Sequence, residues 1–335
     1  MCSSDLPRYL LIHGSPGQIP WGLQYVLNTA AFVGRLDLEA DGLKRYVKAL
    51  LNDWKAAGCR SGQPVVWTVD HGQPDITWLM RRAIAGPVAD KLASDAQIGS
   101  NLRLLAGTGA TAPSLVQALR DRNPALIVTT SHGMTGPLGN PALMARQLGW
   151  LVDDAYALLD PDTLLNAWQP DGAIWYAHAC CSAGSDAPSA YLGLVPKGSP
   201  VAETLAAVAS LGARVAPLPA RLLGAENPLR AFIGQVEPTF DWTLRQPETG
   251  QVLTASLQNA LYDRMHRKRP EPVGLAFAEC YRHVGELLSQ WNQALREVNQ
   301  GTEGAELAAV RTQLTALDRQ SMVILGDPTA CLPPL

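Results

Sequence analysis

Short runs of apolar residues, each closed by glycine, proline or a polar turn, recur along the whole sequence. The runs are Tyr9–Ile12, Pro64–Val69, Leu102–Ala106, Ala125–Thr130, Gly172–Ala179, Ala231–Val236 and Met322–Leu325. They are apolar throughout rather than alternating with polar residues. This pattern favours strands that are covered on both faces, as in a parallel sheet.

The segments between these runs carry helix signals. Ser199 and Pro200 precede an apolar segment over residues 201–211, and Gly212 follows it, so an N-cap, a first-turn proline and a glycine terminator frame a helix. Ser114–Asp121 is a second helix candidate, closed just before the next strand. Alternating strands and helices predict an α/β fold with three layers, in which helices cover both faces of a mostly parallel sheet.

Residues 275–320 follow a different pattern. Apolar residues recur there at helical spacing on both sides of a polar break at residues 301–304. They are Leu275, Phe277, Tyr281, Val284, Leu287, Leu288, Trp291, Leu307, Val310, Leu314 and Leu317. The pattern predicts a helical hairpin that packs against the sheet before the final strand.

The 335 residues are enough for one large domain or two small ones. The first part of the chain has fewer alternations of strand and helix, and several glycine and proline turns. We therefore expect an N-terminal α/β subdomain over residues 1–95, with a boundary near Asp95. The larger domain is expected over residues 96–335 and contains the hairpin.

Composition and charge exclude several classes of protein. Apolar residues make up 47% of the chain and charged residues 17%, which argues for a buried core and against disorder. The formal net charge of -3 is too small to imply a nucleic acid or an acidic membrane as partner. No apolar run reaches the ~18 residues that span a bilayer, and the N-terminus lacks the order of a signal peptide. We expect a soluble, cytoplasmic protein.

The six cysteines stand at positions 2, 59, 180, 181, 280 and 331 and show no C-x-x-C spacing. This spacing argues against a zinc ribbon or a thioredoxin-type motif, and the chain length without a secretion signal argues against a disulfide framework. Most of the cysteines are expected to be small buried apolar side chains. The adjacent pair Cys180 and Cys181 needs a separate explanation.

Two of the apolar runs end in residues that can act together in catalysis. The run Ala125–Thr130 leads into His132 and Gly133, and the run Gly172–Ala179 leads into Cys180, 48 residues after His132. In an α/β sheet the carboxyl ends of neighbouring parallel strands meet at one edge, where active sites collect. We therefore expect the imidazole and the thiol to meet at that edge.

A thiol next to an imidazole is the pair that a cysteine peptidase requires. Only the thiolate attacks a carbonyl efficiently, and a free thiol is mostly protonated at neutral pH. His132 is expected to take the proton of Cys180 and later to protonate the leaving amine. The N–H groups of Gly133 and Cys180 are the expected oxyanion donors, each worth about 3 kcal/mol in transition-state stabilisation.

These blocks resemble those of the caspase, gingipain and CHAT-domain group of cysteine peptidases, in which the histidine precedes the cysteine motif by about 50 residues. Residues 322–329 resemble a C-terminal block of gingipain-like and CHAT proteins, and residues 10–20 with 33–36 are similar to gingipain-like bacterial proteins. The resemblance implies a caspase-like three-layer sandwich and a cysteine endopeptidase that forms a thioester on Cys180. It also implies an activating protein partner or proteolytic activation, in bacterial defence or programmed cell death.

The cysteine block departs from the caspase pattern. Where caspases have Gln-Ala-Cys, this chain has His178-Ala179-Cys180, and a second thiol follows at Cys181. On an extended strand the His178 side chain faces the same side as Cys180, where it either tunes the site or hydrogen-bonds within the core. Cys181 is expected to point elsewhere, into packing.

The residues that orient the histidine and bind substrate are less defined. The orienting group is either a backbone carbonyl or a carboxylate, for which Asp70, Glu237 and Asp241 are candidates. The resemblance places part of the pocket for the residue before the cleaved bond (P1) in the loop after the run that ends at residue 236, and so implies Glu237, Asp241 and Trp242. An acidic group beside an aromatic wall predicts Lys or Arg at P1.

No cofactor or metal is expected. Gly107 and Gly109 belong to no completed phosphate-binding motif, and no His-x-x-x-His spacing indicates a metal site. Two other functions stay open. One is a catalytically silent caspase-like interaction module whose hairpin docks a partner. The other is a redox protein that uses Cys180 and Cys181, which would form only a strained ring.

Overall fold

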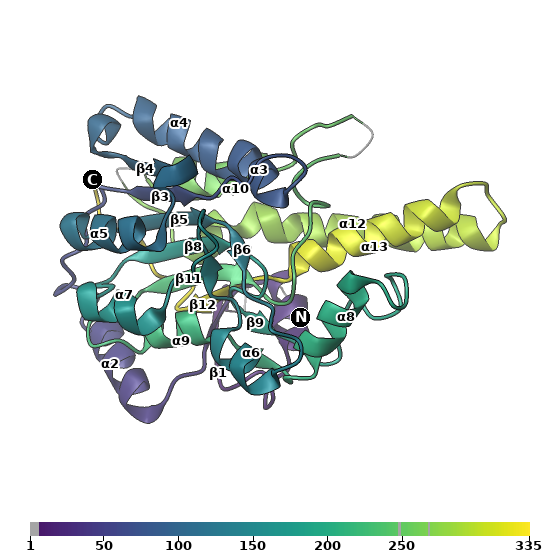
Figure 1. Cartoon of the computed structure of the whole chain (residues 1–335), viewed down its shortest axis with the longest axis horizontal. Coiled ribbons are helices and arrows are strands. Elements are labelled where there is room, and N and C mark those ends of the chain that lie inside the picture. Colours follow the sequence, from purple (N-terminus) through teal and green to yellow (C-terminus); the bar gives the residue numbers. More distant parts are fainter. Residues whose placement is uncertain (1–6, 247–248, 267–268) are drawn as a thin grey trace.

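The computed structural model describes residues 7–246, 249–266 and 269–335, which form an α/β fold around one eight-stranded sheet. The strands lie side by side in the order β1-β2-β12-β11-β8-β5-β3-β4 (Figure 1). Their bounds are β1 Tyr9–His13, β2 Phe32–Leu36, β3 Val65–Thr68, β4 Arg103–Ala106, β5 Leu126–Thr130, β8 Ile174–His178, β11 Ala231–Gln235 and β12 Met322–Gly326. The mostly parallel α/β sheet expected from the apolar runs is confirmed.

The sheet contains one antiparallel junction. β11 pairs antiparallel with β12, and every other neighbouring pair is parallel. The sheet therefore has two blocks of opposite direction, β4-β3-β5-β8-β11 and β12-β2-β1. The carboxyl ends of the five strands in the first block meet at a single edge.

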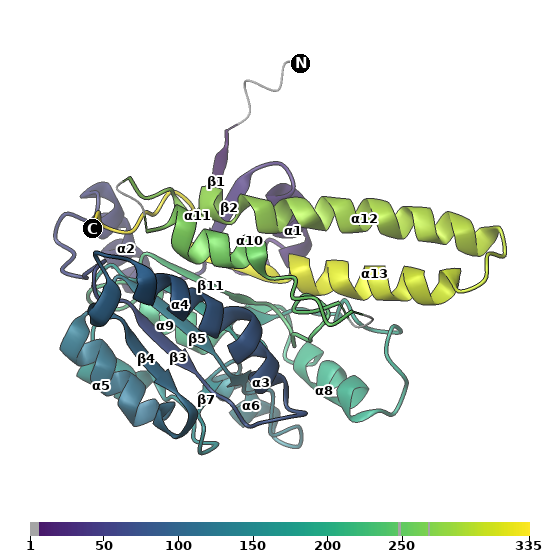
Figure 2. The same ribbon diagram turned by 90° about the horizontal axis from the view of Figure 1, so that it is seen from above.

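Helices cover both faces of this sheet (Figure 2), because almost every residue of its central strands is buried and successive side chains point to opposite sides. Val66, Val128 and Tyr176 belong to one apolar cluster, and Val65, Ile127 and Trp175 belong to the other. The first cluster includes residues of α3 (Ile76–Met80), α4 (Gly86–Ser94), α10 (Ala255–Gln258), α11 (Val273–Ala276) and α12 (Ala278–Asn299). The second includes residues of α1 (Trp21–Asn28), α2 (Ala40–Leu51), α5 (Ala112–Arg122), α7 (Pro161–Ala167) and α9 (Pro217–Leu223). This arrangement is compatible with a three-layer sandwich.

Both helices that the sequence signals predicted are present, with shifted bounds. The helix after Ser199 is α8 (Pro200–Ala209), and the Ser199 side chain accepts a hydrogen bond from the Ala202 N–H. The segment expected at Ser114–Asp121 lies within α5, which starts earlier because Thr111 rather than Ser114 is the N-cap. None of the helices within the described ranges is long and apolar enough to cross a membrane.

The sheet runs across the boundary expected near Asp95. β3 lies before that position, yet it pairs with β4 and β5, which both lie after it. β1 and β2 join the same sheet through β12 at the other end of the chain. The proposed division into residues 1–95 and 96–335 therefore does not separate two sheets.

The hairpin expected at residues 275–320 is formed by α12 and α13 (Ala305–Gln320), directly before β12. The two helices lie side by side, but much of their length projects beyond the sheet instead of packing against it (Figures 1 and 2). Tyr281, Val284 and Leu314 are buried, whereas Leu307 is 65% exposed. The apolar stripe is therefore core only near the body of the protein.

Candidate functional site

Three neighbouring parallel strands end level with one another. Thr68 on β3 is paired with Thr130 on β5, and Thr130 is paired with His178 on β8. The hydroxyl oxygens of Thr68 and Thr130 are 2.8 Å apart and tie the first two ends together. The loops that follow β3, β5 and β8 therefore leave the sheet from the same place.

His132 and Cys180 each lie two residues beyond one of these paired strand ends. His132 belongs to the short strand β6 (His132–Gly133), which pairs with β7 (Leu151–Val152) and so holds the histidine backbone. Gly133 lies directly against the Cys180 backbone, because a Cβ atom added to it would lie 1.9 Å from the Cys180 carbonyl oxygen. The two segments that the sequence predicted would converge do lie next to each other.

Asp75 is the carboxylate that contacts the histidine. Its Oδ2 atom lies 2.9 Å from Nε2 of His132, whereas its Oδ1 atom accepts hydrogen bonds from the backbone N–H and the hydroxyl of Thr77. Asp75 is the N-cap of α3, so the start of that helix fixes its position. Burial alone would raise the pKa of Asp75, but the hydrogen bonds from Thr77 and His132 outweigh it and hold the pKa below its ordinary value.

The thiol of Cys180 is restrained by the loop after β11. It donates a hydrogen bond to the Thr239 carbonyl, with a sulfur–oxygen distance of 3.6 Å, and no hydrogen bond joins it to His132 in the described part of the chain. Burial raises the pKa of the Cys180 thiol, although backbone hydrogen bonds with Thr239 and Gly133 act in the opposite direction. The arrangement therefore holds a protonated thiol beside the histidine segment.

One buried carboxylate of the helical hairpin accepts three hydrogen bonds from the loop that carries Thr239. Asp318 on α13 accepts hydrogen bonds from the Thr239 hydroxyl at 2.8 Å, the Thr243 hydroxyl at 2.7 Å and the Phe240 N–H at 3.2 Å. Burial raises the pKa of Asp318 to about 6, against the effect of these hydrogen bonds. The position of α13 is thereby coupled to the backbone that contacts the Cys180 thiol.

The neighbours of Cys180 in sequence are both buried. The His178 Nδ1 atom lies 2.9 Å from the Tyr176 hydroxyl, and burial lowers the His178 pKa to about 4, so the imidazole is neutral at pH 7. Cys181 has a positive φ of 54° and packs with Met144 and Val208 in a separate apolar cluster. Cys181 therefore points away from Cys180, as expected.

The three residues proposed for substrate binding lie in different surroundings and do not line one pocket together. Glu237 is only 2% exposed, and its carboxylate accepts a hydrogen bond from the Ala190 N–H, so it does not form the wall of an open pocket. Trp242 packs against Phe240. Asp241 lines a cavity of about 450 Å³ that Asp75 also lines, and it pairs with Arg245. The burial of Glu237 and its bond to the Ala190 N–H argue against the predicted contact with a P1 side chain.

The carboxylate that contacts His132 is not among the candidates proposed from the sequence. Of the three carboxylates considered, Asp70 pairs with Arg81, Glu237 bonds to a backbone N–H and Asp241 pairs with Arg245. In the sequence Asp75 looks like an ordinary helix N-cap, and such residues are common. Its partner His132 is 57 positions away. That long-range contact has no counterpart in local sequence spacing.

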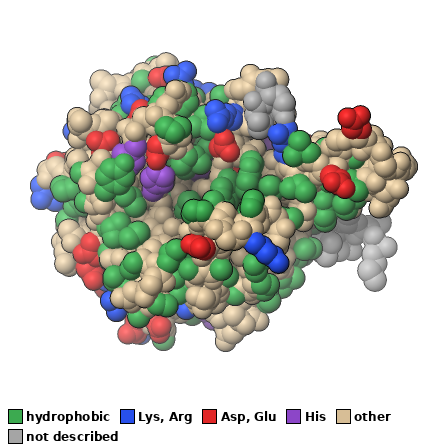
Figure 3. All heavy atoms as spheres, turned by 45° about the vertical axis from the view of Figure 1, so that its right-hand side comes forward, with side chains coloured by type: hydrophobic (Ala, Val, Ile, Leu, Met, Phe, Trp, Pro, Cys, Tyr) green, Lys and Arg blue, Asp and Glu red, His purple; other side chains and the backbone are tan. Residues whose placement is uncertain are grey.

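A group of possible metal ligands was missed as well. One ligand atom each from His71, Asp75 and His132 lies within 4.8 Å of the other two. The rings of His71 and His132 are stacked with centroids 5.7 Å apart. Histidine side chains lie beside an acidic side chain on the surface shown in Figure 3. The expectation of no metal-binding residues rested on local motifs, and this group joins two separate loops.

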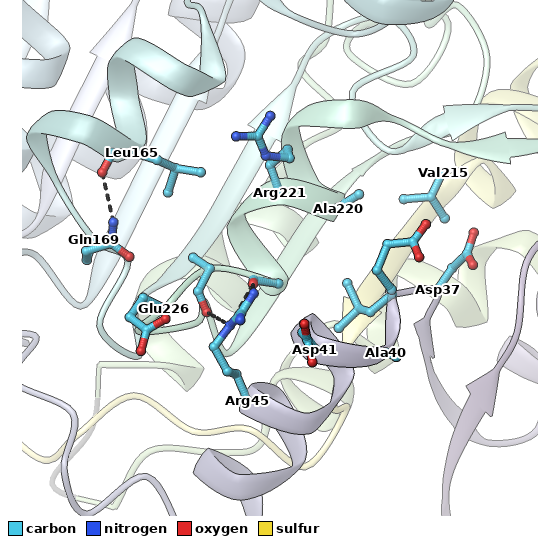
Figure 4. A pocket seen from close by; sticks show the side chains of 15 residues that line it. Asp37, Ala40, Asp41, Arg45, Leu165, Gln169, Val215, Ala220, Arg221 and Glu226 are labelled. Carbon is cyan, nitrogen blue, oxygen red and sulfur yellow. Dashed lines mark hydrogen bonds between the residues drawn. The ribbon is translucent and has the colours of Figure 1, made fainter.

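A cavity of about 650 Å³ lies at the opposite edge of the sheet (Figure 4). Residues that directly follow β2 line it, and because β2 runs antiparallel to β8, the end of β2 lies at the edge opposite Cys180. Across it, Arg45 donates hydrogen bonds to the carbonyls of Gly224 and Ala225. This arginine holds two segments of backbone together, and the cavity shares no residue with the site at Cys180.

Comparison of the chain with models of protein families gave no match, and no curated protein matched it either.

Proposed function

We propose that this chain is a caspase-like cysteine endopeptidase in which Cys180 is the nucleophile and His132 the general base. The observation that carries the proposal is that both residues lie two positions beyond the paired strand ends Thr130 and His178, with Gly133 against the Cys180 backbone. A thiol and an imidazole at adjacent strand ends are the pair that this chemistry requires.

The reaction proceeds in two halves. His132 takes the Cys180 proton, the sulfur attacks the peptide carbonyl, and the N–H groups of Gly133 and Cys180 stabilise the oxyanion. The carbon–nitrogen bond then breaks, and the protonated His132 gives its proton to the departing amine, which leaves a thioester on Cys180. Water, deprotonated by His132, attacks the thioester carbonyl, releases the new carboxyl terminus and restores the thiol.

Asp75 is proposed as the residue that positions His132. Its carboxylate holds one ring nitrogen, and this leaves the other ring nitrogen to accept the proton of the thiol. A carboxylate beside the ring also stabilises the imidazolium that forms when the thiol is deprotonated. The lowered pKa of Asp75 keeps this carboxylate charged at neutral pH.

The enzyme is proposed to rest in a restrained form that a protein partner or proteolysis activates. The Cys180 thiol donates to the Thr239 carbonyl rather than to His132, and burial raises its pKa. Asp318 attaches the Thr239 loop to α13, and the hairpin of α12 and α13 projects from the body, where a partner can reach it (Figure 1). Movement of α13 would therefore release the loop and free the thiol.

The decisive experiment is labelling with an acyloxymethyl-ketone probe, followed by turnover of a mixed fluorogenic peptide library. Wild type and Cys181→Ala should both be labelled and turn over substrate, whereas Cys180→Ala and His132→Ala should lose about 10²-fold or more in rate. Limited proteolysis of the hairpin before the assay tests for a restrained form. Failure to label Cys180 both before and after that treatment would refute the proposal.

A second candidate function is a catalytically silent interaction module on the same scaffold. The observation that favours it is the absence, within the described residues, of a hydrogen bond between Cys180 and His132. Deletion of the distal hairpin, residues 288–312, would abolish partner capture in that case, while Cys180→Ala would leave capture unchanged. If the chain is a peptidase, Cys180→Ala should instead abolish cleavage of the captured protein.

A further inference from the structure

His71, Asp75 and His132 have the composition of a transition-metal site. Each offers one ligand atom, and these atoms all lie within 4.8 Å of one another. Imidazole nitrogens with a carboxylate oxygen suit Zn²⁺ and similar first-row ions, whereas Ca²⁺ and Mg²⁺ prefer sites made of oxygen. We propose that these three side chains bind one Zn²⁺ ion, and that the bound ion switches off the base at His132.

Both ring nitrogens of His71 are available to bind an ion. Both of its nitrogens are shielded from solvent, and neither has a hydrogen-bond partner among the described residues. A polar atom that is buried without a partner costs about 1–3 kcal/mol, and coordination of an ion would remove that cost. The ring is held in place by stacking on Tyr156, with centroids 4.2 Å apart.

The carboxylate is also oriented for an ion. Thr77 occupies Oδ1 of Asp75 with its backbone N–H and its hydroxyl, so Oδ2 is the atom that faces His132. The same Thr77 hydroxyl accepts a hydrogen bond from the backbone N–H of His71. One threonine therefore fixes both ends of the segment from His71 to Asp75, which is the support that metal ligands usually receive.

The site needs a small rearrangement to close around the ion. Ligand atoms around a tetrahedral zinc ion are roughly 3.3 Å apart, a separation that follows from bond lengths of about 2.0 Å. His132 and Asp75 are already closer than that, at 2.9 Å. The rings of His71 and His132 are nearly parallel, at 15°, so the His71 ring must turn, which breaks its stacking on Tyr156 but no hydrogen bond within the described residues.

The effect on catalysis rests on the function proposed above. A neutral imidazole that binds a metal through one nitrogen carries its proton on the other, so His132 would have no lone pair to accept the Cys180 proton. The ion would also take the Asp75 oxygen that orients the ring. Bound Zn²⁺ is therefore expected to lower the rate of Cys180 labelling, while removal by a chelator restores it.

Binding is measured without reference to activity, by competition between the full-length, metal-free protein and a chromophoric chelator for Zn²⁺. Wild type should bind one ion, and His71→Ala should weaken binding at least about tenfold. Cys180→Ser and Cys181→Ser should bind as the wild type does, and so should His13→Ala, a matched loss of an exposed histidine. Thermal unfolding in chelator checks that each variant is folded.

Two results would overturn the metal site: Zn²⁺ affinity unchanged in His71→Ala, or affinity lost in Cys180→Ser. Co²⁺ in place of Zn²⁺ gives a second readout, since a thiolate charge-transfer band would reveal a cysteine ligand and contradict the proposed set. Labelling of Cys180 is then compared with and without Zn²⁺ in wild type and His71→Ala, where only wild type should slow by at least about tenfold. If wild type is never labelled, the peptidase proposal fails, while the chelator competition still decides the metal site.

Discussion

Oδ2 of Asp75 lies 2.9 Å from Nε2 of His132, although the two residues belong to segments that follow different strands of the central sheet. The contact depends on two independent features of the fold. β3 and β5 end level with each other, and the N-cap position of α3 turns the carboxylate back toward the sheet edge. Asp75 thus serves the helix with one oxygen and the imidazole with the other.

Asp75→Asn is expected to lower the rate of Cys180 acylation by about 10²-fold, since an amide neither fixes the imidazole tautomer nor stabilises the imidazolium. The measurement is the second-order rate of labelling by a ketone probe across pH 5–9. Because Asn is also a good N-cap, the variant should stay folded.

Asp70→Asn is the control, because Asp70 lies in the same loop and pairs with Arg81, whose side chain is partly exposed. Loss of that ion pair should cost at most about 1 kcal/mol of folding stability and leave the labelling rate near that of wild type. Equal losses of rate in the two variants would contradict a specific role of Asp75.

The central sheet and the adjacency of the segments that carry His132 and Cys180 were predictable from sequence for the same reason. Strands buried on both faces are apolar throughout, and the residues after such runs must gather where parallel strands end. β2 was not among the predicted runs, because its five residues include Gly34 and the buried Arg35. Arg35 is tolerated there because Gln24 and the carbonyls of Gly14 and Ile19 accept its hydrogen bonds.

The contacts that complete the site were not predictable in this way. Asp318 lies 79 residues from Thr239, and Asp75 lies 57 residues from His132, so neither pair has a periodic signal. The burial of Glu237 was not predictable either. An acidic residue after a strand is usually solvated, whereas Glu237 is 2% exposed and has a left-handed backbone, a combination that local sequence does not reveal.

Asp318→Ala is expected to loosen the Thr239 loop, since it removes the three hydrogen bonds that Asp318 accepts from the loop and leaves the long bond from Arg319 to the Thr243 carbonyl. Iodoacetamide should then alkylate Cys180 about tenfold faster than in wild type, and unfolding should become easier by roughly 3 kcal/mol. Peptide mapping separates Cys180 from the other thiols. Thr243→Val, which removes one of the three bonds, gives a milder variant should the first be unstable.

Asp241→Ala is the matched comparison for Asp318→Ala, since Asp241 lies in the same loop but pairs with the exposed Arg245. Its alkylation rate should equal that of wild type. An unchanged rate in both Asp318→Ala and Thr243→Val would show that the loop does not restrain the thiol.

Glu237→Gln should change the pH dependence of stability. Burial raises the pKa of Glu237 to about 7 from an ordinary value of 4.5, so the folded state holds this proton more tightly than the unfolded state. The stability that the proton contributes is complete below pH 4.5 and is lost as the pH rises through 7. Relative to wild type, Glu237→Gln should therefore gain up to roughly 3 kcal/mol in unfolding free energy between pH 5 and pH 8.

Urea unfolding at both pH values measures this difference, and Glu203→Gln on the exposed side of α8 is the control without a gain. If the difference in unfolding free energy between wild type and Glu237→Gln did not change with pH, the Glu237 carboxyl would have the same pKa in the folded and the unfolded chain. That result would contradict its burial.

Gly133→Ala tests the close approach of the two strand ends. A Cβ atom at this position would lie 1.9 Å from the Cys180 carbonyl oxygen and 2.9 Å from its nitrogen, so β6 and the cysteine segment must move apart. Displacement of about 1 Å in a catalytic pair costs about 10²-fold in rate, and overpacking costs typically 1–3 kcal/mol of stability.

Gly139→Ala is the control, because a Cβ atom there meets nothing within 4 Å. Labelling of Cys180 should fall about 10²-fold in the first variant and stay unchanged in the second. Equal labelling of both would mean that the Gly133 backbone need not lie against Cys180, and would remove the main geometric support for the peptidase.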